Sequence, residues 1–205
     1  MSATVLVTGF GPFGGHTDNP SAGAVELLAR EWAAPAGCPL VTAVLPVSFA
    51  RATAQLRALV EEHAPAVVLG VGLAAGRQRL GLERVALNLV DARIPDVDGA
   101  QPVDVPVLPG EPTARLTTLP VKSALLALQD AGLPAELSLS AGTYVCNAVM
   151  FAGLTYAPDD AVAGFLHVPD VDVLPVADAA QALSVVLTTV LASTTDVVVP
   201  GGRDH

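Results

Sequence analysis

The 205-residue chain has few cysteines and few basic residues. It contains only Cys38 and Cys146, and ten lysine and arginine residues stand against twenty aspartate and glutamate residues. Two cysteines in a chain of this length exclude a disulfide framework and indicate a reducing compartment. The net charge is −10 and the basic residues form no stripe, so nucleic acid and anionic membranes are poor partners.

The chain also lacks a continuous apolar run of about 20 residues, the length that a membrane helix needs. Two long uncharged stretches, 137–158 and 179–195, are interrupted by polar residues. No basic segment followed by an apolar leader opens the sequence. We therefore expect a cytoplasmic protein with no membrane partner.

Charged residues are scarce relative to hydrophobic ones, at 15% against 52%, which predicts a large core and a sparsely charged surface. A chain of this length fits a single domain, residues 1–205, that buries most of its apolar surface without disulfides. The surplus of apolar residues favours a homo-oligomer. Residues from about 194 to 205 are expected to form a loose tail.

Predicted strands and helices alternate along the chain. Apolar, β-branched runs predict strands at 4–8, 40–45, 66–71, 82–90, 135–139 and 161–166. Helices are predicted after the capping residues Asn19 and Ser48, at 121–130, from Cys146 to about 156, and at 176–192. This alternation predicts an α/β three-layer sandwich, with a mostly parallel mixed sheet flanked by helices. Residues 91–119 are expected to form an excursion of turns and short strands.

The segment 133–147 is the most informative part of the chain. It combines a buried strand, a turn containing Gly142, and Cys146 in the first turn of a helix. A helix N-terminus offers unpaired N–H groups and partial positive charge, which lower the pKa of a thiol and can stabilise an oxyanion. We therefore expect a thiolate nucleophile at Cys146. The alternative is that Cys146 only packs in the core, as most isolated cysteines do.

Two other titratable residues could complete a cysteine hydrolase. His167 ends a predicted strand, and it shares a rim with Cys146 if the strands are parallel. Glu83 stands in an apolar strand and needs a partner. Taken alone, an ion pair with Arg77 or Arg79 is the simpler interpretation of Glu83. The histidines and cysteines show no metal-ligand spacing, so no metal site is predicted.

A glycine-rich loop, residues 9–18, follows the first strand and contains Phe10 and Phe13. Its spacing matches neither nucleotide fingerprint and no lysine follows, which counts against a nucleoside- or phosphate-binding enzyme. Two of five phenylalanines in one loop indicate an apolar slot, unless the rings only anchor the loop. The later turn 91–96 offers Arg93, either a surface residue or a positive group beside a reacting carbonyl.

Together these segments resemble the pyroglutamyl peptidase I family, the pyrrolidone-carboxylate peptidases. The resemblance covers the chain from Val5 to about Pro169. Each motif alone is weak, but they follow one another in the family's order. They are VTGFGPFGG (7–15), NPS (19–21), GR (76–77) with LGLERVALN (80–88), DARIPD (91–96), SLSAGTYVCN (138–147) and GFLHVP (164–169).

The resemblance implies a cytoplasmic cysteine exopeptidase, an omega peptidase, that removes an N-terminal 5-oxoproline from peptides through a thioester. It implies an α/β sandwich, no cofactor and a homo-oligomer, usually a tetramer, with a dimer as the smaller alternative. Cys146 would be the nucleophile, His167 the general base and acid, and Glu83 the residue that orients His167. Arg93 matches a family arginine close to the oxyanion.

The same resemblance assigns the substrate pocket. It implies that Phe10, Phe13 and Val145 line the slot for the lactam ring and that Asn19 hydrogen-bonds the substrate. Two positions depart from the family pattern: Leu73 stands where glutamine is common, and Gly81 where serine or threonine is common. We expect altered binding rather than lost chemistry. The alternatives are a thiol amidase with another small N-terminal acyl specificity and a non-catalytic binding relative.

Overall fold

The computed structural model describes residues 4–15, 18–33 and 37–202, in which helices and strands alternate as predicted. The helices are α1 (Pro20–Glu31), α2 (Phe49–His63), α3 (Val121–Asp130), α4 (Val145–Tyr156) and α5 (Val176–Ala192). The strands are β1 (Val5–Phe10), β2 (Leu40–Leu45), β3 (Val67–Leu73), β4 (Leu80–Glu83), β5 (Val85–Leu87), β6 (Ala114–Leu116), β7 (Ala135–Ser138) and β8 (Val162–Val168). None of these helices has the length and apolarity to cross a membrane.

Six strands form one mixed sheet in the order β2-β1-β3-β8-β4-β7. All neighbours are parallel except β4 and β8, which run antiparallel. The remaining strands, β5 and β6, pair as a separate antiparallel ribbon. The predicted α/β class with a mostly parallel mixed sheet is confirmed.

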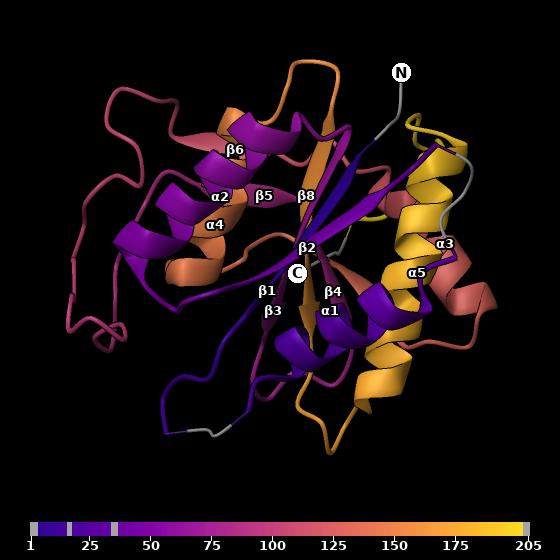
Figure 1. Cartoon of the computed structure of the whole chain (residues 1–205), viewed down its shortest axis with the longest axis horizontal. Coiled ribbons are helices and arrows are strands. Elements are labelled where there is room, and N and C mark those ends of the chain that lie inside the picture. The colour runs from indigo at the N-terminus through magenta and orange to yellow at the C-terminus, as the bar shows by residue number, and fades with distance from the viewer. Residues whose placement is uncertain (1–3, 16–17, 34–36, 203–205) are drawn as a thin grey trace.

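Helices cover both faces of the sheet and make the three layers. Figure 1 shows α2 and α4 on one side of the sheet and α1, α3 and α5 on the other. Alternate residues of β1 enter the two cores: Val5 and Val7 pack under α1 and α5, whereas Leu6 and Phe10 pack under α2 and α4. A parallel sheet buried on both faces requires such continuous apolar strands.

The helix starts follow the predicted caps. The side chain of Asn19 accepts a hydrogen bond from the Ser21 N–H with Pro20 at the first helical position, and Ser48 accepts from the Arg51 N–H. Only short polar side chains reach the free amides of a first turn in this way. Asn19 and Ser48 therefore cap the starts of α1 and α2 as predicted.

The predicted strand 82–90 is divided, which is a correction. β4 ends at Glu83, and β5 leaves the main sheet from Val85 to join β6. The break is at Arg84, whose N–H donates to the Ser138 carbonyl while its own carbonyl accepts from Thr117. Arg84 thus bonds to β7 on one side and to the segment after β6 on the other, and the chain changes sheets there.

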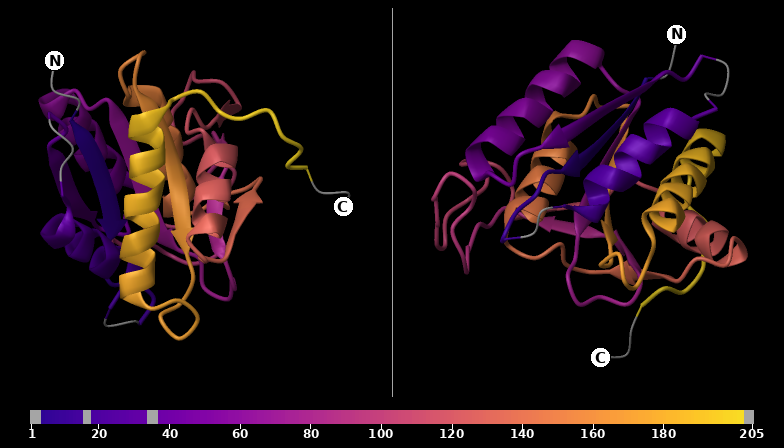
Figure 2. Two further views of the ribbon diagram at one scale, coloured as in Figure 1. Left: turned by 90° about the vertical axis from the view of Figure 1, so that its right-hand side faces the viewer. Right: turned by 60° about the horizontal axis from the view of Figure 1, so that its bottom comes forward.

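The segment after α5 differs from the expected loose tail. The Asp196 carboxylate accepts hydrogen bonds from the N–H groups of Lys122 and Ser123, at the start of α3, and Lys122 Nζ donates to the Val199 carbonyl. The residue before α3, Pro120, supplies no side-chain cap, so Asp196 takes that role from a distant part of the chain. The segment is held against α3 at least to Val199 (Figure 2); residues 203–205 lie outside the described part.

We expect Asp196→Ala to lower the free energy of unfolding by about 1–2 kcal/mol, the usual effect of losing a helix cap. Burial alone would raise the pKa of Asp196, but the hydrogen bonds from Ser123 and Lys122 hold it below its ordinary value. The stabilisation is therefore complete at neutral pH and is lost as the pH falls through that lowered value. Urea unfolding at pH 7 and in acid measures both effects.

Asp159→Ala is the control, because Asp159 lies exposed in a turn far along the chain from α3. It should change stability by less than about 0.5 kcal/mol. Equal effects of the two substitutions at pH 7 would refute the capping role of Asp196.

Candidate active site

A pocket of about 620 Å³ opens beside the start of α4 and at the ends of β1 and β3. Its wall includes most of the residues that the sequence analysis assigns to a site. These are Phe10, Phe13, Asn19, Leu73, Arg93, Cys146 and His167. Segments that are up to 157 residues apart in sequence therefore meet in one cavity, as the sequence analysis expects of parallel strand ends.

The turn that leads to Cys146 is fixed to the loop that carries Arg93. Gly142 adopts φ 82°, which a residue with a side chain rarely does, and the chain then enters α4. Thr143 and Asp91 exchange hydrogen bonds: the Asp91 N–H donates to the Thr143 carbonyl, and the Thr143 hydroxyl donates to the Asp91 carbonyl. Arg93 follows two residues later and lines the pocket with its side chain exposed.

Glycine in β3 makes room for the sulfur of Cys146. A Cβ at Gly72 would lie 2.7 Å from Sγ and 2.9 Å from the Phe165 ring. Gly72 pairs in register with His167 on β8, so the sulfur lies over the same part of the sheet as the imidazole. No hydrogen bond joins Sγ and the ring within the described chain. Catalytic contacts of this kind often tighten only when substrate binds.

Glu83 lies behind His167 and is completely buried. Its Oε1 accepts from His167 Nδ1 at 2.7 Å and from Arg77 Nη1 at 2.8 Å. A carboxylate can only accept, so Nδ1 carries a proton and Nε2 is left to exchange a proton with a thiol. Both contacts considered for Glu83 in the sequence analysis are present: the ion pair with Arg77 and the hydrogen bond with His167.

The pKa of the Cys146 thiol is shifted in the direction opposite to the one expected from the sequence. Burial and the negative charge of Glu83 raise the pKa of Cys146 to about 12, although its own backbone N–H and the charge of Arg77 act in the opposite direction. The expectation of a lowered pKa is wrong, because the cost of burying a charge near a carboxylate exceeds the effect of the helix N-terminus. The resting residue is a thiol, and it needs a base to become a nucleophile.

The start of α4 leaves its first amides available. Tyr144 is its N-cap, but no side chain caps this helix end. The uncapped N–H groups of a first helical turn can stabilise an oxyanion. Val145 is not among the residues that line the pocket, and its side chain is completely buried. The position of Val145 in the first turn leaves its backbone as the part that can serve the site.

Two residues of the site have roles that the sequence analysis did not assign. Asn147 is completely buried; its Oδ1 accepts from the Leu87 N–H, and its Nδ2 donates to the Leu87 and Leu89 carbonyls. These hydrogen bonds hold the start of α4 to β5. The sequence feature that could have indicated this role is a polar asparagine in a largely apolar predicted helix. Tyr144 lines the pocket, with its ring 5.7 Å from that of Phe13.

Asn19 is placed at the pocket edge with its amide already in use. Its Oδ1 accepts from Ser21, and its Nδ2 donates to the Gly11 carbonyl at 3.1 Å. Among the described residues, the second Nδ2 hydrogen has no protein acceptor, so it can serve a ligand. Within the described residues, no group of three His, Cys, Asp or Glu side chains is arranged to hold a metal ion.

Comparison with known proteins gives a consistent result. A family model described as pyroglutamyl peptidase matches residues 3–200. The chain is 43% identical to the pyrrolidone-carboxylate peptidase of Escherichia fergusonii, over 98% of this chain and 99% of that protein. It is 42% identical to the protein of the same name from Clavibacter michiganensis subsp. michiganensis, over 97% and 98%.

Solved structures agree with the sequence relatives. The crystal structure of pyroglutamyl peptidase I from Bacillus amyloliquefaciens superposes with a TM-score of 0.89 at 34% identity, covering 98% of this chain and 100% of that one. A mutant pyrrolidone carboxyl peptidase from Pyrococcus furiosus gives 0.87 at 36% identity, covering 92% and 98%. The similarity therefore extends over almost all of the chain.

The raised pKa of Cys146 predicts slow alkylation at neutral pH. Because only the thiolate reacts, the rate constant for iodoacetamide at Cys146 should increase about tenfold per pH unit between pH 7 and 10. Site-resolved mass spectrometry measures it, with Cys146→Ala reporting the labelling of Cys38. A rate constant that stays level between pH 6 and 8 would instead mean that a thiolate exists before substrate arrives.

Proposed function

The chain belongs to the pyroglutamyl peptidase family, and on this basis we propose that it is a cysteine omega peptidase. It hydrolyses the amide bond that follows an N-terminal pyroglutamyl (5-oxoprolyl) residue of a peptide. The observation that supports this most strongly is the arrangement of Glu83, His167 and Cys146. His167 and Cys146 line one pocket, and Glu83 accepts a hydrogen bond from His167 behind it. We assign them the roles of orienting acid, general base and nucleophile in a single catalytic domain.

The reaction begins with a proton transfer that the thiol cannot make alone. His167 Nε2 takes the Cys146 proton as Sγ attacks the carbonyl carbon of the pyroglutamyl residue. The oxyanion is stabilised by the first amides of α4, with Arg93 as an additional positive group. The imidazolium then donates its proton to the leaving amine, the C–N bond breaks, and a thioester remains.

Hydrolysis of the thioester uses the same residues in reverse. His167 takes a proton from water, whose oxygen attacks the thioester carbonyl. The C–S bond breaks, the proton returns to the Cys146 sulfur, and pyroglutamate leaves. In both steps the Glu83 carboxylate stabilises the imidazolium that forms beside it. The negative charge of Glu83 therefore has two effects. It raises the pKa of the resting Cys146 thiol, and it stabilises the transition states in which the imidazolium forms.

The pocket suits a small uncharged ring. Phe10, Phe13, Tyr144 and Leu73 offer apolar walls for the methylene groups of the lactam. The remaining Nδ2 hydrogen of Asn19 and backbone groups of the loops can pair its polar atoms. The Leu73 side chain cannot form a hydrogen bond, so we assign recognition of the polar lactam atoms at this position to the Leu73 backbone. A site with fixed polar partners can reject an analogue that lacks one by about 10⁴-fold.

Activity assays of matched variants test this function. Wild type should release a fluorescent amine from its pyroglutamyl conjugate, and Cys146→Ala and His167→Ala should each lower kcat by about 10⁴-fold or more. Glu83→Gln should also be severely impaired, because it orients His167 less well. Cys38→Ala is the control and should retain activity, and a chelator should have no effect.

The same assay tests the alternative that the protein is a thiol amidase that removes a different small N-terminal acyl group. Faster release from prolyl or glutaminyl conjugates than from the pyroglutamyl conjugate would identify a related amidase. No release from any conjugate would favour a binding protein that keeps the fold.

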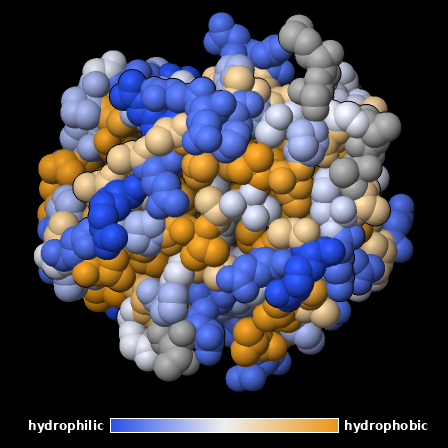
Figure 3. Space-filling model, in the orientation of Figure 1, coloured by the Kyte–Doolittle hydropathy of each residue, from blue (hydrophilic) through white to orange (hydrophobic). Residues whose placement is uncertain are grey.

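We also propose a cytoplasmic homo-oligomer, a tetramer or a dimer. Both described cysteines are free, which suits a reducing compartment. Apolar side chains stand exposed on the surface, including Leu116 at 69% and Leu139 at 65%. Figure 3 shows hydrophobic residues among hydrophilic ones on one face. Exposed apolar surface of this kind is typical of subunit contacts.

Analytical ultracentrifugation tests the assembly. We expect a mass of two or four times the 20.7 kDa of one chain. Leu139→Glu should shift the distribution towards single chains if its surface is in the contact. A single-chain mass at every concentration would refute the proposal.

A further inference from the structure

Arg77 makes contacts on two sides of the triad. It stands between β3 and β4, and its guanidinium donates from Nη1 to Glu83 Oε1 at 2.8 Å and from Nη2 to the Ser140 carbonyl at 3.2 Å. Glu83 is the buried acid, and Ser140 belongs to the turn that leads to Cys146. One side chain therefore joins the acid strand to the nucleophile's turn.

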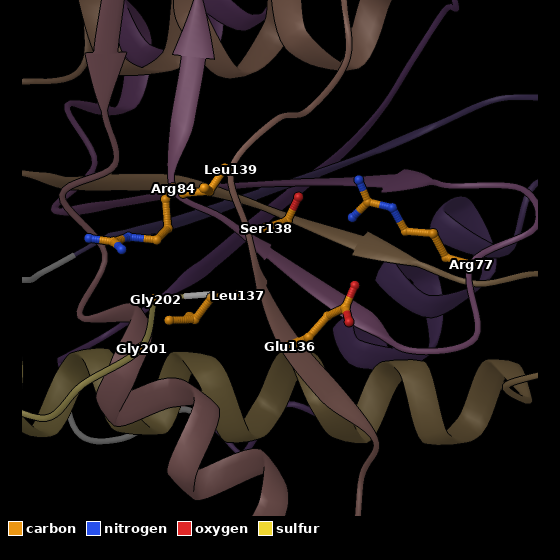
Figure 4. Close-up of a pocket in the computed structure, with 8 residues that line it drawn as sticks. All are labelled: Arg77, Arg84, Glu136, Leu137, Ser138, Leu139, Gly201 and Gly202. Carbon is orange, nitrogen blue, oxygen red and sulfur yellow. The ribbon is translucent and has the colours of Figure 1, made fainter. Parts of the chain in front are cut away.

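Arg77 also separates two cavities. It lines the pocket of Cys146 and His167, and it lines an outer groove with Glu136 and Ser138. Figure 4 shows its side chain extending from the β3–β4 connection towards the end of β7, where Ser138 lies. The side chain is 29% exposed, so the aqueous groove is on one side of the guanidinium and the completely buried Glu83 is on the other.

Gly81 provides the space that the guanidinium occupies. A Cβ at Gly81 would overlap Arg77 Nη1, and it would lie 3.3 Å from Glu83 Oε1 and 3.5 Å from the His167 Cβ. The backbone of Gly81 does not need glycine, because its φ lies outside the left-handed region. In this chain the Arg77 guanidinium therefore occupies the space that a side chain at position 81 would fill, and we refer to the two residues as the Arg77–Gly81 pair.

Glu83 depends on this pair for its charge and its orientation. A carboxylate removed from water needs a compensating cation. Both of its hydrogen bonds meet at Oε1, and Oε2 has no partner among the described residues. Without Arg77, only His167 would fix the carboxylate, and the buried negative charge would lose its cation.

We propose that Arg77 is a positioning residue of the triad, which occupies the space left free at Gly81 and holds Glu83 against His167 while it anchors the turn before Cys146. This inference rests on the proposed function and extends it. Arg77 touches none of the reacting atoms. It acts through Glu83, through the Ser140 turn, and through its charge beside the thiol.

The charge of Arg77 gives a signature that a merely structural role would not. Because its charge lowers the pKa of Cys146, its loss should slow alkylation at pH 9 by about threefold or more. The other titratable or charged groups that line the two cavities or contact Arg77 are Glu83 on β4, Cys146 on α4, His167 on β8, Arg93 and Tyr144 at the pocket wall, and Arg84 and Glu136 in the outer groove.

The experiment compares Arg77→Met with Arg79→Met, which removes a cation from an exposed position in the same loop. Arg77→Met should lower kcat/KM by about 10- to 100-fold, as expected for a misplaced catalytic group, whereas Arg79→Met should stay near wild type. Arg77→Lys should recover part of the loss, because it keeps the charge without the two-pronged contact. Thermal melting identifies variants that do not fold.

Gly81→Ala tests the same idea without removing the arginine. Its methyl group should move Nη1 away from Glu83 and produce part of the kcat/KM loss of Arg77→Met, because the hydrogen bond is disturbed while the cation is kept. The double variant should be no worse than Arg77→Met alone, and multiplying defects would overturn the contact between the two positions. Alkylation and kcat/KM of Arg77→Met equal to those of Arg79→Met would overturn the positioning role.

The alkylation rate also separates this inference from the proposed function. Wild type without activity on pyroglutamyl conjugates would refute the function, but the difference in Cys146 alkylation between Arg77→Met and Arg79→Met would still be measurable. A difference supports the role of Arg77 at the thiol, and equal rates exclude it.

Discussion

The buried carboxylate of Glu83 is the feature on which the rest of the site depends. It has no exposure to water, and a single oxygen, Oε1, receives both His167 and Arg77. A charge in such a place is tolerable only when its partners are fixed by the surrounding structure. The sheet and the loops around β4 can therefore be understood as the framework that keeps those partners in place.

The mixed sheet is what makes this arrangement available. β4 runs antiparallel to β8, so Gly81 and Glu83 lie opposite His167 and Phe165 on the same face. On the other side of β8, β3 presents Gly72 opposite His167, where the cysteine sulfur lies. Glycine in both strands that flank His167 admits another residue's side chain: the guanidinium of Arg77 at Gly81 and the thiol at Gly72.

Local patterns predicted the helices and the α/β class, because capping and periodicity are properties of neighbouring residues. The bounds 121–130 and 176–192 agree with α3 and α5. The break at Arg84 was missed because it depends on bonds to β7 and to Thr117, which no local pattern contains. The helix containing Cys146 was predicted, but the direction of its pKa shift was not. That shift depends on burial and on Glu83, which is distant in the sequence.

The raised pKa of Cys146 changes how the triad has to work. A standing thiolate would need only a substrate, whereas a thiol must lose its proton as it attacks. The carboxylate that disfavours the thiolate is also the group that stabilises the imidazolium formed in that step. In the proposed mechanism, Glu83 therefore raises the pKa of the resting Cys146 thiol and assists its attack during the reaction. The charge of Arg77 moderates the first effect, since it lowers the pKa of Cys146 while it holds Glu83 in place for the second.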